Sequence, residues 1–95
     1  YMIIPPRNAD EIIQEGKNLK HCVGSYIERI INSETTILFL REIENPDNPF
    51  YTIEINDLYI KQCRGFENME MDKEITKFMD KFKKHIERMN LRKAN

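Results

Sequence analysis

The residues best suited to chemistry lie close together, at His21, Cys22, Gly24 and Tyr26. Apolar residues recur at helical spacing over residues 19–31, which predicts a helix that begins near Lys20–His21. Cys22 then lies in the first turn, where free backbone N–H groups and the helix dipole favour a thiolate or a bound anion. Gly24 costs such a helix about 1 kcal/mol relative to alanine. That cost indicates close approach of another element or of a ligand.

A second polar group follows the strand predicted at residues 58–63. Leu58 and Ile60 point to one side of this strand, and strict alternation places Gln62 and Arg64 on the same, inward side. The alternative is that the strand simply ends in solvent. If the helix at residues 19–31 packs across the sheet, the two groups meet. We therefore predict one binding site, made of His21, Cys22, Gly24, Tyr26, Gln62, Arg64 and Asn68.

The candidates for catalysis within this site are His21, Cys22 and Arg64. Neighbouring helical residues project about 100° apart, so His21 could not easily take the proton of Cys22. A structural role for both residues is equally open, because cysteine packs as a small hydrophobe. A metal-independent nuclease could use His21 as general acid or base and Arg64 to stabilise a developing phosphorane charge. The same groups would equally bind an anion without chemistry, and their spacing does not separate the two hypotheses.

Metal and cofactor motifs are weak in this sequence. The only Cys and His side chains lack the paired spacing of structural zinc sites; they are His21, Cys22, Cys63 and His85. A P-loop and a Rossmann glycine pattern are both absent. Glu54 and Asp57 flank a predicted hairpin turn, where acids are ordinarily solvated, which argues against a metal nuclease. We expect no metal and no cofactor.

The C-terminal region has the opposite charge from the rest of the chain. Residues 73–93 contain eight Lys/Arg and three Asp/Glu, a net charge of +5, whereas residues 1–72 contain seven and thirteen, a net charge of −6. At 100° per residue, five cations form one stripe opposite the apolar face: Lys73, Lys77, Lys81, Lys84 and Arg88. Such a stripe could bind the phosphates of DNA or RNA. The alternative is a solvated face, and no aromatic residues interleave to stack on bases.

The remaining pattern predicts the elements that position these residues. A short strand at residues 2–4 is stopped by Pro5–Pro6. Asn8 and Glu11 resemble a capping box that opens a helix at Ala9, and Gly16 is a natural stop for it. After the helix at residues 19–31 come a central strand at 35–40, a half-buried strand at 50–55 and the strand at 58–63, with a turn at Asn56–Asp57. A final helix has one apolar face, formed by Ile75, Phe78, Met79, Phe82, Ile86 and Met89.

These elements predict an α+β fold. An antiparallel three-stranded meander, to which residues 2–4 could add a short fourth strand, would carry two N-terminal helices and one long C-terminal helix on one side. Ninety-five residues make a single domain, residues 1–95. Two cysteines are few for a secreted domain of this size, and no apolar run reaches the roughly 20 residues that span a bilayer. We expect a cytoplasmic protein without membrane contact.

Blocks of sequence spread over the chain resemble the PcfJ-like proteins of bacterial conjugative plasmids, phages and related mobile elements. The blocks are Glu15-Gly16, Leu19, His21-Cys22-Val23-Gly24, Tyr26, Phe39-Leu40-Arg41, Thr52-Ile53-Glu54 and Gln62-x-Arg64-Gly65-x-x-Asn68. The resemblance covers residues 4–82 and implies a C-terminal domain cut from a longer protein. It implies a setting rather than a mechanism. We therefore expect an accessory domain that binds nucleic acid or a protein of the transfer apparatus, with a small enzyme using His21 and Arg64 as the alternative.

Overall fold

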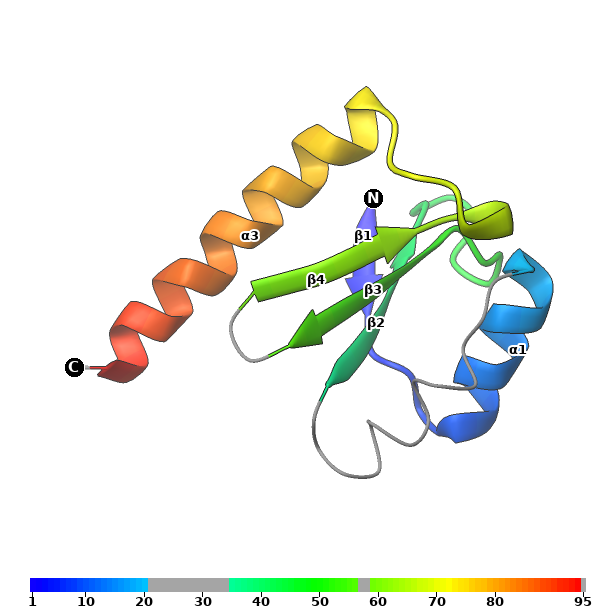
Figure 1. The fold of residues 1–95 in the computed structure, drawn as a ribbon, viewed down its shortest axis with the longest axis horizontal. Coiled ribbons are helices and arrows are strands. Elements are labelled where there is room, and N and C mark those ends of the chain that lie inside the picture. Colours follow the sequence, from blue (N-terminus) through cyan, green and yellow to red (C-terminus); the bar gives the residue numbers. More distant parts are fainter. Residues whose placement is uncertain (21–34, 57–58, 95) are drawn as a thin grey trace.

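The computed structural model describes residues 1–20, 35–56 and 59–94, with only the backbone for residues 90–94. The helix predicted at residues 19–31 therefore lies, after Lys20, outside the described residues. The described elements are β1 (Met2–Ile4), α1 (Ala9–Leu19), β2 (Thr36–Arg41), β3 (Tyr51–Asn56), β4 (Tyr59–Arg64), the short 3-10 helix η1 (Phe66–Asn68) and α3 (Lys73–Ala94) (Figure 1).

The four strands form one antiparallel sheet in the order β1-β2-β3-β4. The predicted meander is thereby confirmed, and β1 adds a fourth strand beside β2. One row of cross-strand partners runs through the sheet, from Ile4 to Phe39, then to Thr52 and to Arg64. Because directly opposed residues project from the same face of a sheet, this row assigns alternate residues of β1, β2 and β3 to one face or the other.

The helices pack on opposite faces of the sheet, so the prediction that they share one side is wrong. Ile37 and Phe39 of β2 pack with Ile12 of α1. Leu40, in the opposite orientation on the same strand, packs with Ile75 of α3. The two helices accordingly lie on different sides of the strands (Figure 1). A strand that is apolar on both faces needs a cover on each, and that requirement decides the three-layer arrangement.

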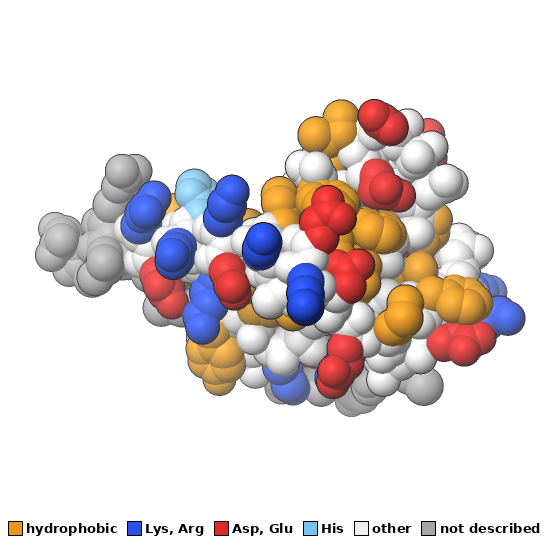
Figure 2. Space-filling view, turned by 90° about the horizontal axis from the view of Figure 1, so that it is seen from above, with side chains coloured by type: hydrophobic (Ala, Val, Ile, Leu, Met, Phe, Trp, Pro, Cys, Tyr) orange, Lys and Arg blue, Asp and Glu red, His pale blue; other side chains and the backbone are white. Residues whose placement is uncertain are grey.

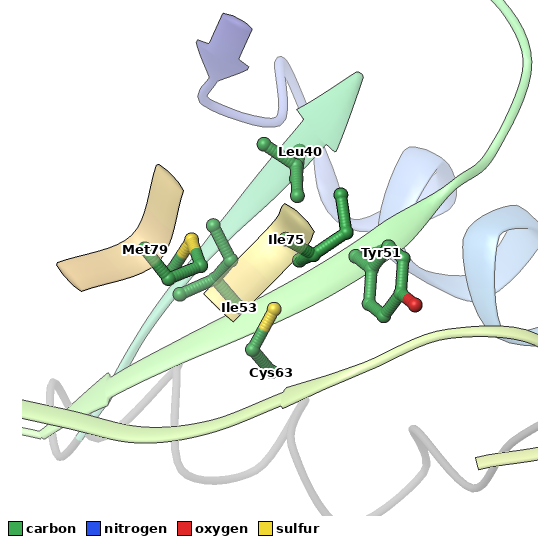
Figure 3. Packing of buried hydrophobic residues seen from close by; sticks show 6 residues of the cluster. All are labelled: Leu40, Tyr51, Ile53, Cys63, Ile75 and Met79. Carbon is green, nitrogen blue, oxygen red and sulfur yellow. The ribbon is translucent and has the colours of Figure 1, made fainter. Parts of the chain in front are cut away.

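The larger core lies between α3 and the sheet (Figure 3). It consists of Leu40, Tyr51, Ile53, Cys63, Ile75 and Met79. Phe78 and Phe82 are only partly buried at its margin. The ring of Tyr1 stacks on Phe50 at 5.9 Å and meets Phe78 edge-on at 5.4 Å between centroids. These contacts attach the start of the chain to α3.

The start of α1 follows its sequence signal, but its end does not. Asn8 is the N-cap, and its side-chain oxygen accepts from the backbone N–H of Glu11 at 3.0 Å. The stop predicted at Gly16 is wrong, because α1 continues to Leu19 and is capped by Lys20 in the left-handed conformation, at φ 53°. Gly16 and Leu19 are both buried. Burial of this last turn outweighs the local preference of glycine for a helix end.

Candidate functional site

The predicted orientation of Gln62 and Arg64 is wrong, because β4 contains a β-bulge. Glu54 pairs with Gln62 and Ile55 pairs with Ile60, so Lys61 is the extra residue of β4. One extra residue reverses the alternation of side chains beyond it. Ile60 therefore packs in the core under α3. Gln62 and Arg64 project from the other face, on which α1 lies.

That face of the sheet is polar where strands β2, β3 and β4 contribute Arg41, Thr52, Glu54, Gln62 and Arg64. We call these five residues the polar face. Arg41 continues the orientation of Ile37 and Phe39, and Thr52 lies opposite Phe39. Strand β3 was predicted to be half-buried, but Thr52 and Glu54 are as buried as its apolar residues. The polar face is therefore an interior surface over much of its extent.

A bidentate ion pair connects the polar face to α1. Arg41 donates from both terminal nitrogens to Glu15, Nη1 to Oε2 at 2.7 Å and Nη2 to Oε1 at 2.5 Å. The two side chains are only 6% and 2% exposed. The guanidinium carbon also lies 4.7 Å from the centroid of the Phe39 ring. Two charges buried away from water are stable only when most of their hydrogen-bonding atoms have partners. The two parallel hydrogen bonds between Arg41 and Glu15 satisfy most of these atoms.

Burial is the largest influence on the carboxyl of Glu15 and raises its pKa, while hydrogen bonds from Arg41 and Thr52 act in the opposite direction. The pairing of Arg41 is nevertheless incomplete. Its Nη1 also donates to the carbonyl of Leu40 at 3.2 Å, but its Nε is buried and has no hydrogen-bond partner among the described residues. A buried donor left in this state is uncommon in folded proteins.

Glu54 carries a second buried carboxylate, on the same face. It is 1% exposed, and it accepts from the Thr35 hydroxyl at 2.9 Å and from the Gln62 amide at 3.1 Å. The expectation that Glu54 is solvated near a hairpin turn is therefore wrong. Asp57, its expected companion, lies outside the described residues. Among the residues that the structure describes, no group of three or more His, Cys, Asp or Glu side chains could hold a metal ion.

The structure places only part of the predicted binding site. Arg64 is 32% exposed at the end of β4 and forms an ion pair of 3.2 Å with Glu70. Asn68 is exposed in η1 at φ 63°, and its backbone N–H donates to the carbonyl of Gly65. The remaining members, His21, Cys22, Gly24 and Tyr26, lie outside the described residues. The convergence of all seven on one site thus stays a prediction.

The other cysteine is buried in the core, on the opposite side from the polar face. Burial raises the pKa of the Cys63 thiol to about 12, and the neighbouring Arg64 only partly opposes this. The thiol therefore remains protonated at neutral pH, and such a group is a poor nucleophile and a poor metal ligand.

The basic stripe, the predicted row Lys73, Lys77, Lys81, Lys84 and Arg88, is exposed at every position. The opposite side of α3 is anchored by Ile75 and Met79, both buried against the sheet. Figure 2 shows Lys and Arg side chains following one another along this helix, with acidic side chains beside them. The stripe spans sixteen residues, and the fifteen steps between its ends correspond to about 22 Å at 1.5 Å per residue.

Sequence reasoning missed the part of the site that the structure defines best, namely Glu15, Arg41 and Thr35. One signal was available. By strict alternation Arg41 lies on the same face as the apolar residues Ile37 and Phe39, and the strand was predicted to be central. A charged residue at an inward position needs a buried partner. The partner, Glu15, lies 26 residues earlier in the chain, and no local pattern connects the two.

The comparison with known families identifies the family of this chain. The profile of the PcfJ-like proteins matches residues 1–79, so the chain belongs to the PcfJ-like protein family. The matched region contains both buried carboxylates, Arg41 and the whole sheet.

A relative from Listeria innocua, Lin1253/Lin1744, is 40% identical over 72 residues. The match covers 74% of this chain but only 16% of that relative, so the chain spans a small part of the protein that it resembles. No solved structure matches the chain. Among the described residues, no helix is both long enough and apolar enough to cross a membrane.

Proposed function

We propose that this chain is a cytoplasmic accessory domain of a bacterial mobile genetic element and that it binds DNA or RNA through the basic stripe of α3. The observation that carries the proposal is the exposure of all five cations on one side of a helix whose other side is fixed to the core. The setting rests on membership of the PcfJ-like family and on the sequence blocks that resemble its mobile-element members.

The geometry of the stripe suits a row of phosphates. Its members are separated by three or four residues, which is about 4.5–6 Å along the helix axis. Acidic residues of α3 lie beside the stripe rather than within it, since Glu74, Asp80 and Glu87 fall outside its arc at 100° per residue. Ile75 and Met79 fix the first turns of the helix in the core, on the side away from the cations. Recognition of this kind depends on charge and is independent of sequence.

Salt dependence gives a quantitative test. If all five cations contact phosphates of a duplex, log K should fall with log[salt] at a slope of about −4.5. A fourfold rise in salt would then weaken binding roughly 500-fold. Fluorescence anisotropy with a labelled duplex and a labelled single-stranded RNA measures both slopes.

A charge-reversal variant and a matched control make this test specific. Lys77→Glu, Lys81→Glu and Lys84→Glu together should abolish binding. The control combines Lys17→Glu, Lys61→Glu and Lys83→Glu, which are exposed outside the stripe and give the same net charge. The control should keep most of the affinity. Equal loss in both variants, or no binding by the wild type even at low salt, would contradict a role for the stripe.

The same labelled nucleic acids and variants also test two alternative functions, a nuclease and a domain that binds a protein. A metal-independent nuclease using His21 and Arg64 would degrade the labelled DNA or RNA with and without chelator, and the variant Arg64→Ala would not. Nucleic acid that stays intact after long incubation would contradict the nuclease hypothesis and favour binding alone. If the stripe variant still binds a protein of the transfer apparatus while nucleic-acid binding is absent, the partner is that protein.

A further inference from the structure

Two depressions lie end to end along α1. The first has a volume of about 770 Å³ between α1 and the loop at residues 46–49. The second, of about 340 Å³, lies where the end of α1 approaches η1. Asn18 and Pro49 line both of them. The two depressions are therefore neighbours along α1, and we call the pair the α1 groove.

The first part of the α1 groove is acidic. Its lining includes four carboxylates and two guanidinium groups, a net charge of −2. Arg7 pairs with Glu11 at 3.0 Å, and Arg41 pairs with Glu15. The two remaining carboxylates, Asp10 and Asp47, supply the surplus negative charge. This part of the groove would attract a cationic group and would repel a phosphate backbone.

The second part of the groove is apolar. Leu19, Phe50 and Tyr51 line it together with two large side chains that remain well exposed, Phe66 at 45% and Met69 at 57%. The amino group of Lys20 lies 5.5 Å from the centroid of the Phe66 ring. Exposed apolar side chains gathered at a depression are typical of surfaces that bind another molecule.

Arg41 forms part of the floor of the acidic depression. It lines the first depression, and its Nε is the buried donor that lacks a partner among the described residues. Its charge is already balanced by Glu15. Because this Nε is buried, it lies beneath the surface of the depression, and its signal can report a molecule bound above it without bonding to that molecule.

We propose that the α1 groove binds an extended peptide segment of a partner protein, with a Lys or Arg at the Asp10 and Asp47 end and an apolar residue against Phe66 and Met69. From Asp10 to Leu19, α1 rises about 14 Å at 1.5 Å per residue. An extended peptide covers that length with about four residues, at roughly 3.3 Å each. The cationic and apolar residues should accordingly lie about four positions apart. No residue of the basic stripe lines either depression, so the variants that test this site leave the stripe intact.

The test uses fluorescein-labelled peptides in which Lys and Phe are separated by a variable number of alanines. Anisotropy titrations of the chain should show the tightest binding at about three intervening alanines. Replacing the peptide Lys with norleucine should weaken binding at least about tenfold, since the charge attraction is lost. The groove variant Asp10→Asn with Asp47→Asn should show a similar loss. A matched control, Glu42→Gln with Glu44→Gln, removes two exposed carboxylates outside the groove lining and should bind as the wild type does.

Two further measurements distinguish peptide binding in the groove from binding elsewhere and from dimerisation of the chain. Peptide binding should shift the NMR signal of the Arg41 Nε–H group, whereas binding elsewhere would leave it in place. Sedimentation of the wild type should show a monomer before peptide is added. The proposal is overturned if no peptide spacing binds, if the Asp10/Asp47 variant binds unchanged, or if the wild type is a dimer that this variant dissociates. The last result would make a second copy of the chain the occupant.

Discussion

Arg41 at the end of β2 and Glu15 in α1 form a buried, two-pronged ion pair that joins the sheet to the helix across 26 residues of sequence. Thr52 of β3 lies close enough to share the same carboxylate, with its hydroxyl 3.5 Å from Oε2. Three secondary-structure elements thus meet at Glu15. The pair also forms the inner wall of the α1 groove, so its stability bears on both architecture and binding.

Removing one member of this pair should lower the free energy of unfolding much more than replacing both members by apolar side chains. Glu15→Gln leaves the guanidinium of Arg41 buried without a counter-charge, which typically costs about 3–5 kcal/mol of unfolding free energy. That is a large share of the roughly 5–15 kcal/mol available to a small domain. Urea unfolding followed by circular dichroism measures the loss.

The double variant Glu15→Leu with Arg41→Met is the matched control, because it removes both charges at similar volume. It should be clearly more stable than the summed losses of the single variants Glu15→Leu and Arg41→Met predict. Additive losses would show that the two side chains do not depend on each other.

Alanine substitutions on the apolar side of α3 should lower the free energy of unfolding in proportion to how deeply each side chain is buried. Ile75 is fully buried, so Ile75→Ala should cost about 2–5 kcal/mol. Phe82 is only partly buried, and Phe82→Ala should therefore cost less than the roughly 3–5 kcal/mol of a fully buried phenylalanine. Met89 is exposed on the same helix and serves as control, since Met89→Ala should change stability by about 0.5 kcal/mol or less. A large effect at Met89 would mean that α3 packs in another orientation.

The thiol of Cys63 should make the fold sensitive to alkaline pH. Its pKa is about 12 in the folded protein, compared with 9.0 for an unperturbed thiol. Above about pH 9 the unfolded chain loses this proton first, so it binds fewer protons than the folded chain and the free energy of unfolding falls. The expected slope is about 1.4 kcal/mol per pH unit, up to the folded pKa.

The variant Cys63→Val isolates this contribution, because all other titrating groups remain. The stability difference between wild type and variant should change with that slope when urea unfolding is repeated at rising pH. A pH-independent difference would contradict the burial of the thiol.

The end of α1 offers a stabilising substitution. Lys20 adopts φ 53° and ψ 44°, a left-handed conformation in which a side chain is strained and glycine is not. Lys20→Gly should therefore raise the free energy of unfolding by a few tenths to about 1 kcal/mol, less any contribution from the contact with Phe66. The control Lys17→Gly, inside the helix, should lower stability by about 1 kcal/mol. A destabilised Lys20→Gly variant would mean that the left-handed cap is absent in solution.

Local sequence signals predicted the elements well where the deciding interactions are also local. The alternation of Tyr51, Ile53 and Ile55 located β3, and the asparagine at position 8 located the start of α1, because caps and strand periods act over a few residues. The end of α1 was misplaced at Gly16, since burial against distant residues kept the last turn helical. The bulge at Lys61 was missed for a similar reason, because the pairing with β3 decides it.

By itself, the sequence determined the three-stranded meander, most of the apolar face of α3 and the position of the basic stripe, because turns, hydrophobic period and charge position are properties of short segments. Only the tertiary structure decided which face of the sheet each helix covers and which polar side chains meet there. Arg41 and Glu15 became partners, and Glu54 became buried, through packing between elements far apart in the chain. Such pairs form because a buried charge needs a partner, and here that partner lies in a distant segment of the chain.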